Sequence, residues 1–490
     1  MILALILLPT ICAAAVFVLG GTRLRRVLLV GAAIGHAGMT ALAWWRVPQP
    51  ALAGWLSLDA PGLLFLTVTS ALFLAAALYA LGYLAFEPLG NVTDLEEGFL
   101  FKNAPEAVFI SCMLIFLASM TLVTASRHFG LLWIGIEATT LASAPLIYFH
   151  RHHRSLEATW KYLLICSVGI ALALLGNFFL GAAVAPSSGR ASLLLDDLLK
   201  NPGALNPAWL KAAFVLMLIG YGTKMGLAPL HTWLPDAHSE APSVVSALLS
   251  GALLNCAFLG ILRIYQLCGA AGQGAMCQKA LLTLGVVSVA VGAVFILGQS
   301  DFKRLLAYSS VENMGLLAIG LGVGGVGTIG ALFHAVNHSL VKGMLFLLAG
   351  NILVVYRTKA IAPVRGLLRR LPWTGALWLA GFLAITGTPP FSPFFSKFLI
   401  LKACFDSGHW LVGVLLLFLL AVIFIGMAKA CLSMSQGIPE PDNVPAPVRG
   451  WLTVLPPAAL AGIALWLGLG IPVQLVGLLD AAARALGGLR

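Results

Sequence analysis

Stretches of about twenty apolar residues recur along the whole 490-residue chain, and each is long enough to cross a bilayer as an α-helix. Hydrophobic residues make up 60% of the chain and charged residues only 10%, which is far outside the range of soluble proteins. The first stretch, residues 2–19, lacks a basic leader and a small-residue cleavage site, so we expect a retained helix. The pattern predicts an all-α integral membrane protein of about 14 transmembrane helices with no soluble domain between them.

Basic side chains set the predicted orientation of these helices. The formal charge of +11 is compatible with nucleic-acid binding, but the basic residues gather in short loops, as the positive-inside rule describes. Clusters at Arg23, Arg151, Lys303 and Arg365 recur after every second predicted helix, and the acidic loop from Glu87 to Lys102 is the one departure. We expect these loops in the cytoplasm, both termini outside, and a multi-pass chain in the cell inner membrane. The lipid bilayer, and no nucleic acid, is then its surroundings.

The sequence offers no motif for a metal, a cofactor or a catalytic centre. The eight cysteines mostly lie in apolar stretches and form no C-x-x-C pair, so we expect small core residues. His150, His152 and His153 resemble a metal cluster, but their spacing beside arginines favours a solvated orienting loop. The chain has no nucleophile elbow and no phosphate-binding loop. We therefore expect no cofactor in this chain.

A proline beside a lysine interrupts the seventh predicted helix. Within the run at residues 218–251, Lys224 is followed by Pro229 and His231. Proline removes a backbone donor and clashes with the preceding turn, so the helix kinks or unwinds there. A lysine at such a break is costly unless it lies inside protein or beside water. Because burial lowers the pKa of an amine and a nearby carboxylate raises it, such a lysine is a switchable proton site.

The twelfth predicted helix, from about Trp373 to Cys404, repeats this pattern and presents Lys397 after a break at Pro389, Pro390 and Pro393. Helix eleven carries His334, His338 and Lys342 at intervals of four, which places them on one face along roughly 12 Å. Packing explains three titratable groups on one stripe poorly. This ladder is therefore predicted to relay protons.

Other polar residues lie inside predicted helices. Glu137 in helix five and Glu312 in helix ten are the two carboxylates well inside a span, and Asn255 lies at depth in helix eight. Lys161 lies one turn into helix six, where a functional role and simple snorkelling to the interface are about equally favoured.

The order of these features indicates an approximate repeat. Helices four to eight have Glu137 in their second member and Lys224 in a broken fourth member, and helices nine to thirteen have Glu312 and Lys397 in the same ranks. Units with an odd number of helices must be inverted across the membrane, which is a transporter architecture. The predicted units are an N-terminal three-helix segment (1–103), a first five-helix repeat (104–278), a second, inverted five-helix repeat (279–435) and a C-terminal helix 14 (436–490).

Four separated runs resemble one known family. The runs are HTWLPDAHSEAPSVVSALLSG, SDFKRLLAYSSVENMG, FHAVNHSLVKGMLFLLAGN and GTPPFSPFFSKFLILKA. They are similar to the antiporter-like subunits shared by respiratory complex I, Mrp cation/proton antiporters and membrane-bound group 4 [NiFe]-hydrogenases. Within that family the runs resemble most the hydrogenase-4 component F type. The resemblance covers roughly residues 60–430 and implies fourteen helices, two inverted repeats and a central polar axis for proton translocation.

The resemblance also implies roles for individual residues. Glu137 and Lys224 would form a modulating ion pair with Lys161 next to it, and Lys397 would be the terminal gate. The residues that would continue the axis between them are His334, His338 and Lys342. Where relatives often carry lysine or histidine in helix eight, this chain has Asn255, which would organise water instead. The chain also ends soon after helix fourteen, so it is not expected to be the distal subunit of complex I.

The expected function is proton translocation within a membrane-bound oxidoreductase of the hydrogenase-4 or formate hydrogenlyase type. A redox event in other membrane or peripheral subunits would move charge near Lys224, and nickel–iron centres, iron–sulfur clusters or quinone would belong to those partners. Two alternatives stay open. One is an Mrp-type antiporter that carries Na⁺, or a related subunit that serves ion or inorganic carbon uptake. The other is a scaffold whose buried charges merely pair.

Overall fold

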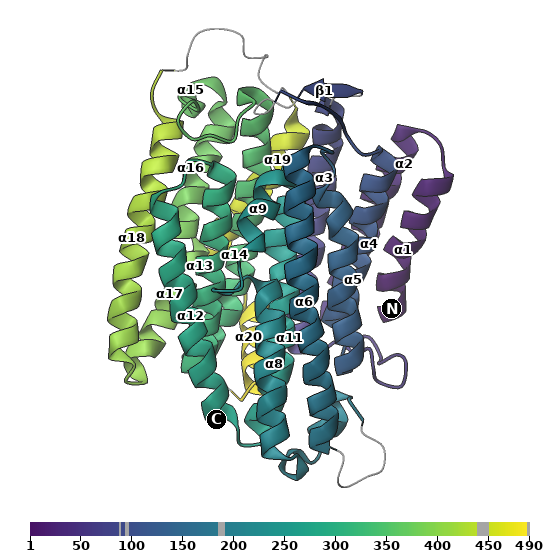
Figure 1. Ribbon diagram of the computed structural model, residues 1–490, viewed down its shortest axis with the longest axis vertical. Helices are drawn as coiled ribbons and strands as arrows, with labels where there is room; N and C mark the ends of the chain where they lie inside the picture. Colours follow the sequence, from purple (N-terminus) through teal and green to yellow (C-terminus); the bar gives the residue numbers. More distant parts are fainter. Residues whose placement is uncertain (88–89, 94–97, 185–191, 439–449, 488–490) are drawn as a thin grey trace.

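The computed structural model describes residues 1–87, 90–93, 98–184, 192–438 and 450–487. Long helices run side by side along the length of the molecule, and a short hairpin lies across one end (Figure 1). Eleven of the described helices are long and apolar enough to cross a membrane, and the shorter apolar helices Ile2–Val18 and Pro372–Thr386 accompany them. The predicted all-α membrane architecture is confirmed at this level.

The first part of the chain leads from the N-terminus to a broken helix. Its elements are α1 (Ile2–Val18), α2 (Thr22–Trp45), α3 (Ala60–Phe86), β1 (Asn91–Thr93), β2 (Leu100–Lys102), α4 (Glu106–Ala125), α5 (Phe129–Ile147), α6 (His153–Val184), α7 (Leu195–Leu198), η1 (Pro202–Ala204), α8 (Pro207–Met225) and α9 (Trp233–Glu240). The second part continues to the C-terminus. Its elements are α10 (Ser243–Leu248), η2 (Leu249–Leu253), α11 (Leu254–Ala270), α12 (Gly274–Leu297), α13 (Phe302–Val323), α14 (Val326–Tyr356), α15 (Leu367–Arg370), α16 (Pro372–Thr386), α17 (Ser392–Asp406), α18 (Trp410–Ser435), α19 (Trp451–Leu469) and α20 (Val473–Ala485).

The helix ends follow from local sequence chemistry. Asn206 caps α8 by accepting from the amides of Ala208 and Trp209, and Pro207 occupies the first turn, where no donor is needed. Asp301 caps α13 in the same way. Gly226 ends α8 in the left-handed conformation at φ 82°, which a residue with a side chain rarely adopts.

Both predicted helix breaks are present. Residues 226–232 separate α8 from α9, and residues 387–391 separate α16 from α17. One detail of the prediction is wrong, because Pro393 lies in the first turn of α17 rather than in the break. Proline fits there because the first helical turn has no intrahelical acceptor for its missing N–H.

Three features of the fold were not predicted. The helix expected over residues 451–479 is two helices, since Gly470 is extended and Pro472 cannot donate to a continuing helix. The acidic loop from Glu87 to Lys102 forms the β1–β2 hairpin in its described part, while residues 94–97 of that loop lie outside the described residues. A single π turn, η2, interrupts the helix that holds Asn255.

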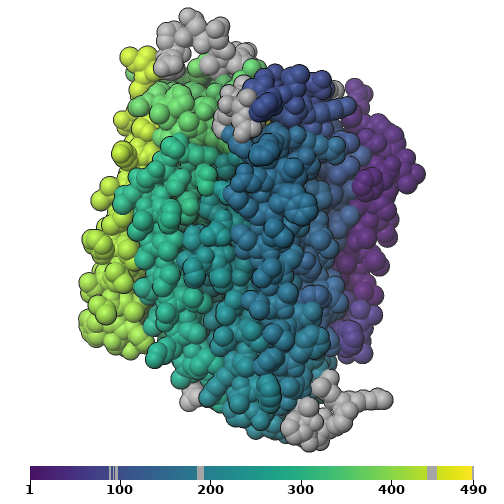
Figure 2. Space-filling model, viewed as in Figure 1, coloured from purple at the N-terminus to yellow at the C-terminus, as the bar shows by residue number. Residues whose placement is uncertain are grey.

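The core lies along α10, α11, α13 and α14. The apolar windows of these spans are 83% to 100% buried, whereas those of α2, α18 and α19 are 33% buried. In the space-filling view the N-terminal helices cover one edge of the molecule and α18 lies at the opposite edge (Figures 1 and 2). The outer helices present apolar side chains outward, as lipid requires, and the inner helices carry the buried polar residues.

The basic loops share one end of the bundle. The turn between α1 and α2, the hairpin and α15 lie at this end, and both termini lie toward the other (Figure 1). Bridges between Asn103 and His150 and between Asp301 and Ala360 tie loops of this end together. We call this the basic end and the other the opposite end.

A charge cluster at the opposite end joins the N-terminal helices to the bundle. Asp59 caps α3 and accepts from Arg127 at 2.6 Å and from Arg263 at 2.5 and 2.7 Å. Arg127 also pairs with Asp196. Burial by itself would raise the pKa of Asp59, but the charges of Arg263 and Arg127 outweigh it and lower that pKa to about 2.

We predict that the basic end faces the cytoplasm, as the positive-inside rule requires. Single cysteines at Ala362 in the loop before α15 and at Asn201 before α8 are both on exposed positions. In intact cells an impermeant maleimide should label position 201 and not 362, and inside-out vesicles should reverse this. The native cysteines are buried or half-buried and give a low background. Labelling of 362 in intact cells would invert the assigned orientation.

We also predict that the Asp59 cluster stabilises the fold in a pH-dependent way. Because the folded pKa lies below the unfolded value, Asp59 contributes stability above about pH 4 and loses it as the pH falls through 2. Asp59→Asn should cost on the order of 2 kcal/mol at pH 7, and the gap from wild type should close in acid. Denaturant unfolding in detergent between pH 3 and 7 measures this. Asp197→Asn, which breaks an exposed pair with Lys200, is the control and should change little.

Candidate functional site

Most of the predicted polar residues are buried in the centre of the bundle. Lys224, Asn255, Glu312, His334, His338 and Lys342 are at most 1% exposed, Lys397 is 6% exposed and His231 is 7% exposed. Glu137 is half-buried, and Lys161 is exposed. Eight of the ten predicted residues therefore lie where water is scarce, and their side chains must find partners within the protein.

The second break places Lys397 against a carboxylate. The Lys397 ammonium donates to Glu312 Oε1 at 3.0 Å, and Asn313 Nδ2 donates to Glu312 Oε2 at 2.6 Å. The aliphatic part of Lys397 runs back over Gly387, where an added Cβ would lie 3.1 Å from the lysine Cδ. Gly387 is left-handed at φ 86°, so the turn that ends α16 also makes room for the lysine.

A continuous chain of hydrogen bonds leads from this ion pair to the ladder on α14. His334 Nε2 lies 2.8 Å from Asn313 Oδ1, and His334 Nδ1 lies 2.9 Å from Ser396 Oγ. Asn337 donates to Ser396 Oγ at 3.1 Å and to the carbonyl of Ser392 at 3.0 Å. Neither Asn313 nor Ser396 was predicted. Both stand beside a predicted residue in the sequence, and this adjacency was the available signal.

Lys342 and His338 continue the ladder with fewer partners. The Lys342 ammonium donates to the carbonyl of Leu306 at 2.5 Å and to Ser309 Oγ at 2.7 Å, both on α13. Neither ring nitrogen of His338 has a hydrogen-bond partner among the described residues, although the side chain is fully buried. Buried polar groups of this kind are usually satisfied by ordered water.

Asn255 contacts the ladder from α11. Its amide nitrogen donates to Ser339 Oγ at 2.7 Å and to the carbonyl of Gly251 at 3.1 Å. Its oxygen has no partner within the described part of the chain. Ser339 lies between His338 and Lys342 on α14, so Asn255 reaches the same stripe of residues. A donor and a free acceptor suit a residue that orients water.

The first break holds Lys224 in a different way from the one implied by the resemblance. The Lys224 ammonium donates to Thr140 Oγ1 at 2.8 Å and to Tyr162 OH at 2.5 Å, and it lies over the Tyr162 ring. Thr140 donates in turn to Glu137 at 3.3 Å, and Ser167 donates to the other carboxylate oxygen. Glu137 and Lys224 are therefore bridged by a hydroxyl rather than in direct contact. The threonine one turn after Glu137 keeps the two charges apart.

Lys161 does not lie beside that pair. Its ammonium contacts Glu157 at 2.6 Å and Asp236 at 3.0 Å near the basic end, and its side chain is 46% exposed. The implied position next to Glu137 and Lys224 is wrong, because a side chain one turn into α6 reaches the interface more easily than the centre. His231 lies in the first break, 6.1 Å from the Tyr308 ring between ring centroids.

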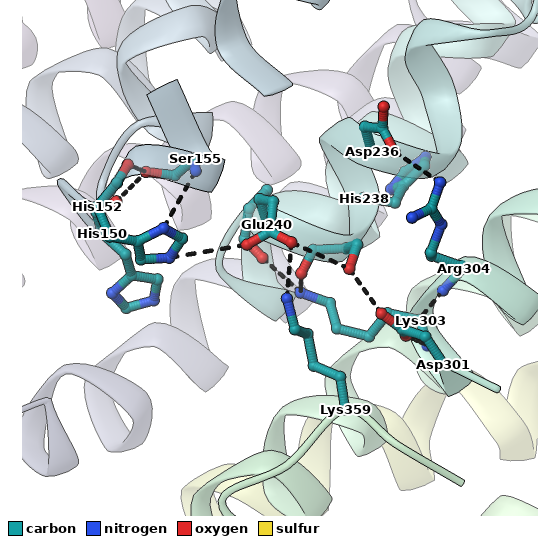
Figure 3. Close-up of polar contacts among 12 residues, drawn as sticks. His150, His152, Ser155, Asp236, His238, Glu240, Asp301, Lys303, Arg304 and Lys359 are labelled. Carbon is teal, nitrogen blue, oxygen red and sulfur yellow. Dashed lines mark hydrogen bonds and ion pairs between the residues drawn. The ribbon is translucent and has the colours of Figure 1, made fainter. Parts of the chain in front are cut away.

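A cavity of about 700 Å³ opens at the basic end, and sequence reasoning missed it. Its lining comes from loops far apart in the sequence and includes His150, His152, Glu240, Lys303 and Lys359. Glu240, at the end of α9, lies at the centre (Figure 3). Lys359 contacts it at 2.7 Å and His152 at 3.7 Å. The histidine loop is thus part of a polar cluster rather than a freely solvated loop.

Lys303 and Asp236 join α9 to its neighbours. The Lys303 ammonium donates to the carbonyls of Ser239 and Ala241 at 3.1 and 2.5 Å (Figure 3). One turn earlier, Asp236 accepts from Arg304 on α13 at 2.7 Å and from Lys161 on α6 at 3.0 Å. The second half of the broken helix is therefore held by cations from both sides.

His238 lies between this cluster and the ladder. It is fully buried, and neither ring nitrogen has a partner among the described residues. Its ring stacks on Phe346, one turn beyond Lys342 on α14, at 4.8 Å between centroids. His238 was treated as a loop residue in the sequence. Its position in the middle of an apolar-flanked helix turn only becomes evident once α9 packs inside the bundle.

Known proteins resemble this chain over most of its length. A family model described as NADH:quinone oxidoreductase/Mrp antiporter, TM, matches residues 126–424. The chain is 36% identical over 391 residues to a hydrogenase-4 component F homolog of Methylacidiphilum infernorum, covering 79% of this chain and 80% of the relative. The resemblance predicted from the four sequence runs, including that to hydrogenase-4 component F, is confirmed.

Solved structures show the same fold. A chain of respiratory complex I from Thermus thermophilus superposes with a TM-score of 0.77 at 25% identity, covering 99% of this chain and 100% of that chain. A chain of an archaeal membrane-bound sulfane sulfur reductase superposes with a TM-score of 0.85 at 23% identity, covering 99% and 97%.

We predict that Thr140 is needed to hold the buried ammonium of Lys224. Thr140→Val keeps the side-chain shape but removes one of two hydrogen bonds to a buried charge, which should cost on the order of 1–3 kcal/mol. Thr139→Val is the matched control, since Thr139 is equally buried and bonds only to its own helix at Ile136. The melting temperature in detergent should fall clearly for the first variant and little for the second. Equal melting temperatures would contradict the bridging role.

Proposed function

This chain belongs to the NADH:quinone oxidoreductase/Mrp antiporter transmembrane family, and we propose that it moves protons as a subunit of a hydrogenase-4-like redox complex. It is an antiporter-like, multi-pass integral membrane subunit of the kind found in complex I, hydrogenase-4 and Mrp-related complexes. Its place in one particular complex, the direction of transport and the role of each residue are parts of the proposal.

The observation that carries the proposal is the hydrogen-bonded chain beside the second break. Lys397, Glu312 and His334 are titratable, fully or nearly fully buried, and connected through Asn313 at 2.6 to 3.0 Å. A scaffold would not need titratable groups in sequence, because buried charges cost free energy that apolar packing avoids. Groups at this spacing can pass a proton once one of them changes its charge.

Lys224 is the proposed point of control. Two unit charges 4 Å apart interact by about 4 kcal/mol at an effective dielectric of 20, which is enough to shift a pKa by a few units. Glu137 reaches Lys224 through Thr140, so neutralising or moving the carboxylate removes support from the ammonium. The half-buried Glu137 lies where a neighbouring subunit can act on it. A redox event in such a partner would then release a proton from Lys224.

The cavity at the basic end is the proposed place of proton uptake. It contains imidazole, carboxylate and ammonium groups, and His238 lies between them and Lys342. His338 and Asn255 have unpartnered atoms among the described residues, and water bound there would bridge the remaining steps. Lys342, His334 and Lys397 would carry the proton onward.

The finer architecture is also part of the proposal. We infer fourteen spans, with inverted five-helix units over 104–278 and 279–435 flanked by 1–103 and 436–490. The two centres support this arrangement, since each has an acid on one helix and a lysine beside a broken helix. The basic end would face the cytoplasm and the chain would lie in the inner membrane. Nickel–iron, iron–sulfur or quinone chemistry would belong to partner subunits.

Replacing the two break lysines tests the function. Lys224→Met and Lys397→Met keep side-chain length and remove the charge, so both should assemble yet lose most of the pH gradient formed in inverted vesicles. Lys211→Met on α8 and Lys402→Met on α17 are matched controls, because both lysines are on the same helices but at exposed positions. The controls should transport normally.

A double variant separates charge balance from transport. Lys224→Met leaves the Glu137 carboxylate without its bridged cation, whereas Glu137→Gln with Lys224→Met leaves no uncompensated charge. The double variant should therefore reach higher membrane yield than Lys224→Met alone while remaining inactive. Full transport by both single lysine variants would refute proton translocation through this axis, and sodium-dependent transport would favour the Mrp-type alternative.

A further inference from the structure

The end of α19 lies directly against the second break. Gly468 lies in the final turn of α19, and a Cβ added there would lie 2.7 Å from the Ser392 amide nitrogen and 2.8 Å from the Phe391 carbonyl carbon. The carbonyl oxygen of Pro390 would be nearer still. All three are backbone atoms, and none can rotate away. Contacts below 3.0 Å are not tolerated, so the segment between α16 and α17 fits only against a glycine.

The same helix touches the ladder one step away. Leu460 on α19 packs beside Gly343, where an added Cβ would lie 3.2 Å from the leucine Cδ1, and Gly343 follows Lys342. Leu460 and Gly468 are eight residues apart, or roughly 12 Å along a helix. One rigid helix therefore rests on α14 next to Lys342 and on the break that precedes Lys397.

The join between α19 and α20 provides a hinge next to this contact. Gly470 is fully extended at φ −174°, and Pro472 precedes α20 without a donor. An added Cβ at Gly470 meets nothing within 4 Å, so this join is open to movement. Beyond it, α20 packs on α3 and α14. The end of α19 can therefore shift with the second break while α20 stays in place.

We propose that α19 is a positioning element of the axis, and that Gly468 is its positioning residue. The backbone contact at Gly468 fixes where the second break lies, and the break fixes how the Lys397 side chain runs over Gly387 to reach Glu312. When Lys397 changes partners, the break and the end of α19 move together about the hinge at residues 470–472. This inference rests on the proposed function, because it assigns a purpose to the position of Lys397.

Alanine at position 468 tests the contact. Gly468→Ala should assemble, because the change is one methyl group at the chain's periphery, but the displaced break should lower proton translocation by on the order of ten-fold. It should also shift the pH profile of transport, since the distance between Lys397 and Glu312 changes. Gly462→Ala on the same helix and Gly477→Ala on α20 add the same methyl group in open space and should leave both rate and profile unchanged.

A second variant tests the hinge without touching the contact. Gly470→Ala combined with Pro472→Ala favours a continuous helix through the join, so it should keep normal membrane yield and lose transport. This variant decides the matter if Gly468→Ala does not assemble. Wild-type rate and pH profile in the hinge variant, or in an assembled Gly468→Ala, would overturn the inference. Lys397→Met measured in parallel separates the two hypotheses. If it is inactive while the α19 variants are active, only the positioning role fails, and if it is active, the proposed function itself fails.

Discussion

A buried ammonium group among apolar helices is the constraint on which the rest of this structure depends. Each such group is costly unless hydrogen-bond acceptors surround it, and the bilayer supplies none. The chain meets the requirement differently at its three central lysines. Lys397 has a carboxylate, Lys342 has a carbonyl and a hydroxyl, and Lys224 has two hydroxyls. The cost of releasing the proton therefore differs from one lysine to the next, which is what a directional relay needs.

Close helix packing brings these acceptors into reach. A Cβ at Gly220 on α8 would meet the carbonyl of Gly169 on α6 at 2.5 Å, so these helices touch backbone to backbone, and α6 carries Tyr162 to Lys224. On the other side, Gly285 and Gly315 bring α12 and α13 together in the same way near Glu312. Small residues at helix contacts are the usual means of close packing in membranes. Rigid packing also gives the breaks their meaning, because they are the places where the backbone can move.

Sequence reasoning identified the titratable residues but not all their partners. The ladder of His334, His338 and Lys342 was predictable because four-residue spacing fixes a helix face. The bridge at Thr140 was not, since a threonine in an apolar helix commonly bonds to its own backbone. The basic-end cavity was missed because its lining comes from separate loops whose meeting depends on the whole bundle. The break at residues 470–472 could have been read from Gly470 and Pro472, but no charged residue drew attention to it.

The sequence by itself determined that this chain is a membrane protein, where most helices lie, which two are broken beside lysines, and which family it belongs to. These conclusions rest on local properties, namely the length of apolar runs, the backbone chemistry of proline and glycine, and short motifs. Tertiary structure decided which acid each lysine meets, that Lys161 turns to the basic end, and that α19 rests on the second break. Such contacts join residues as far apart as Glu312 and Lys397 or Pro390 and Gly468. They depend on how the helices pack, and no periodicity within one helix encodes that.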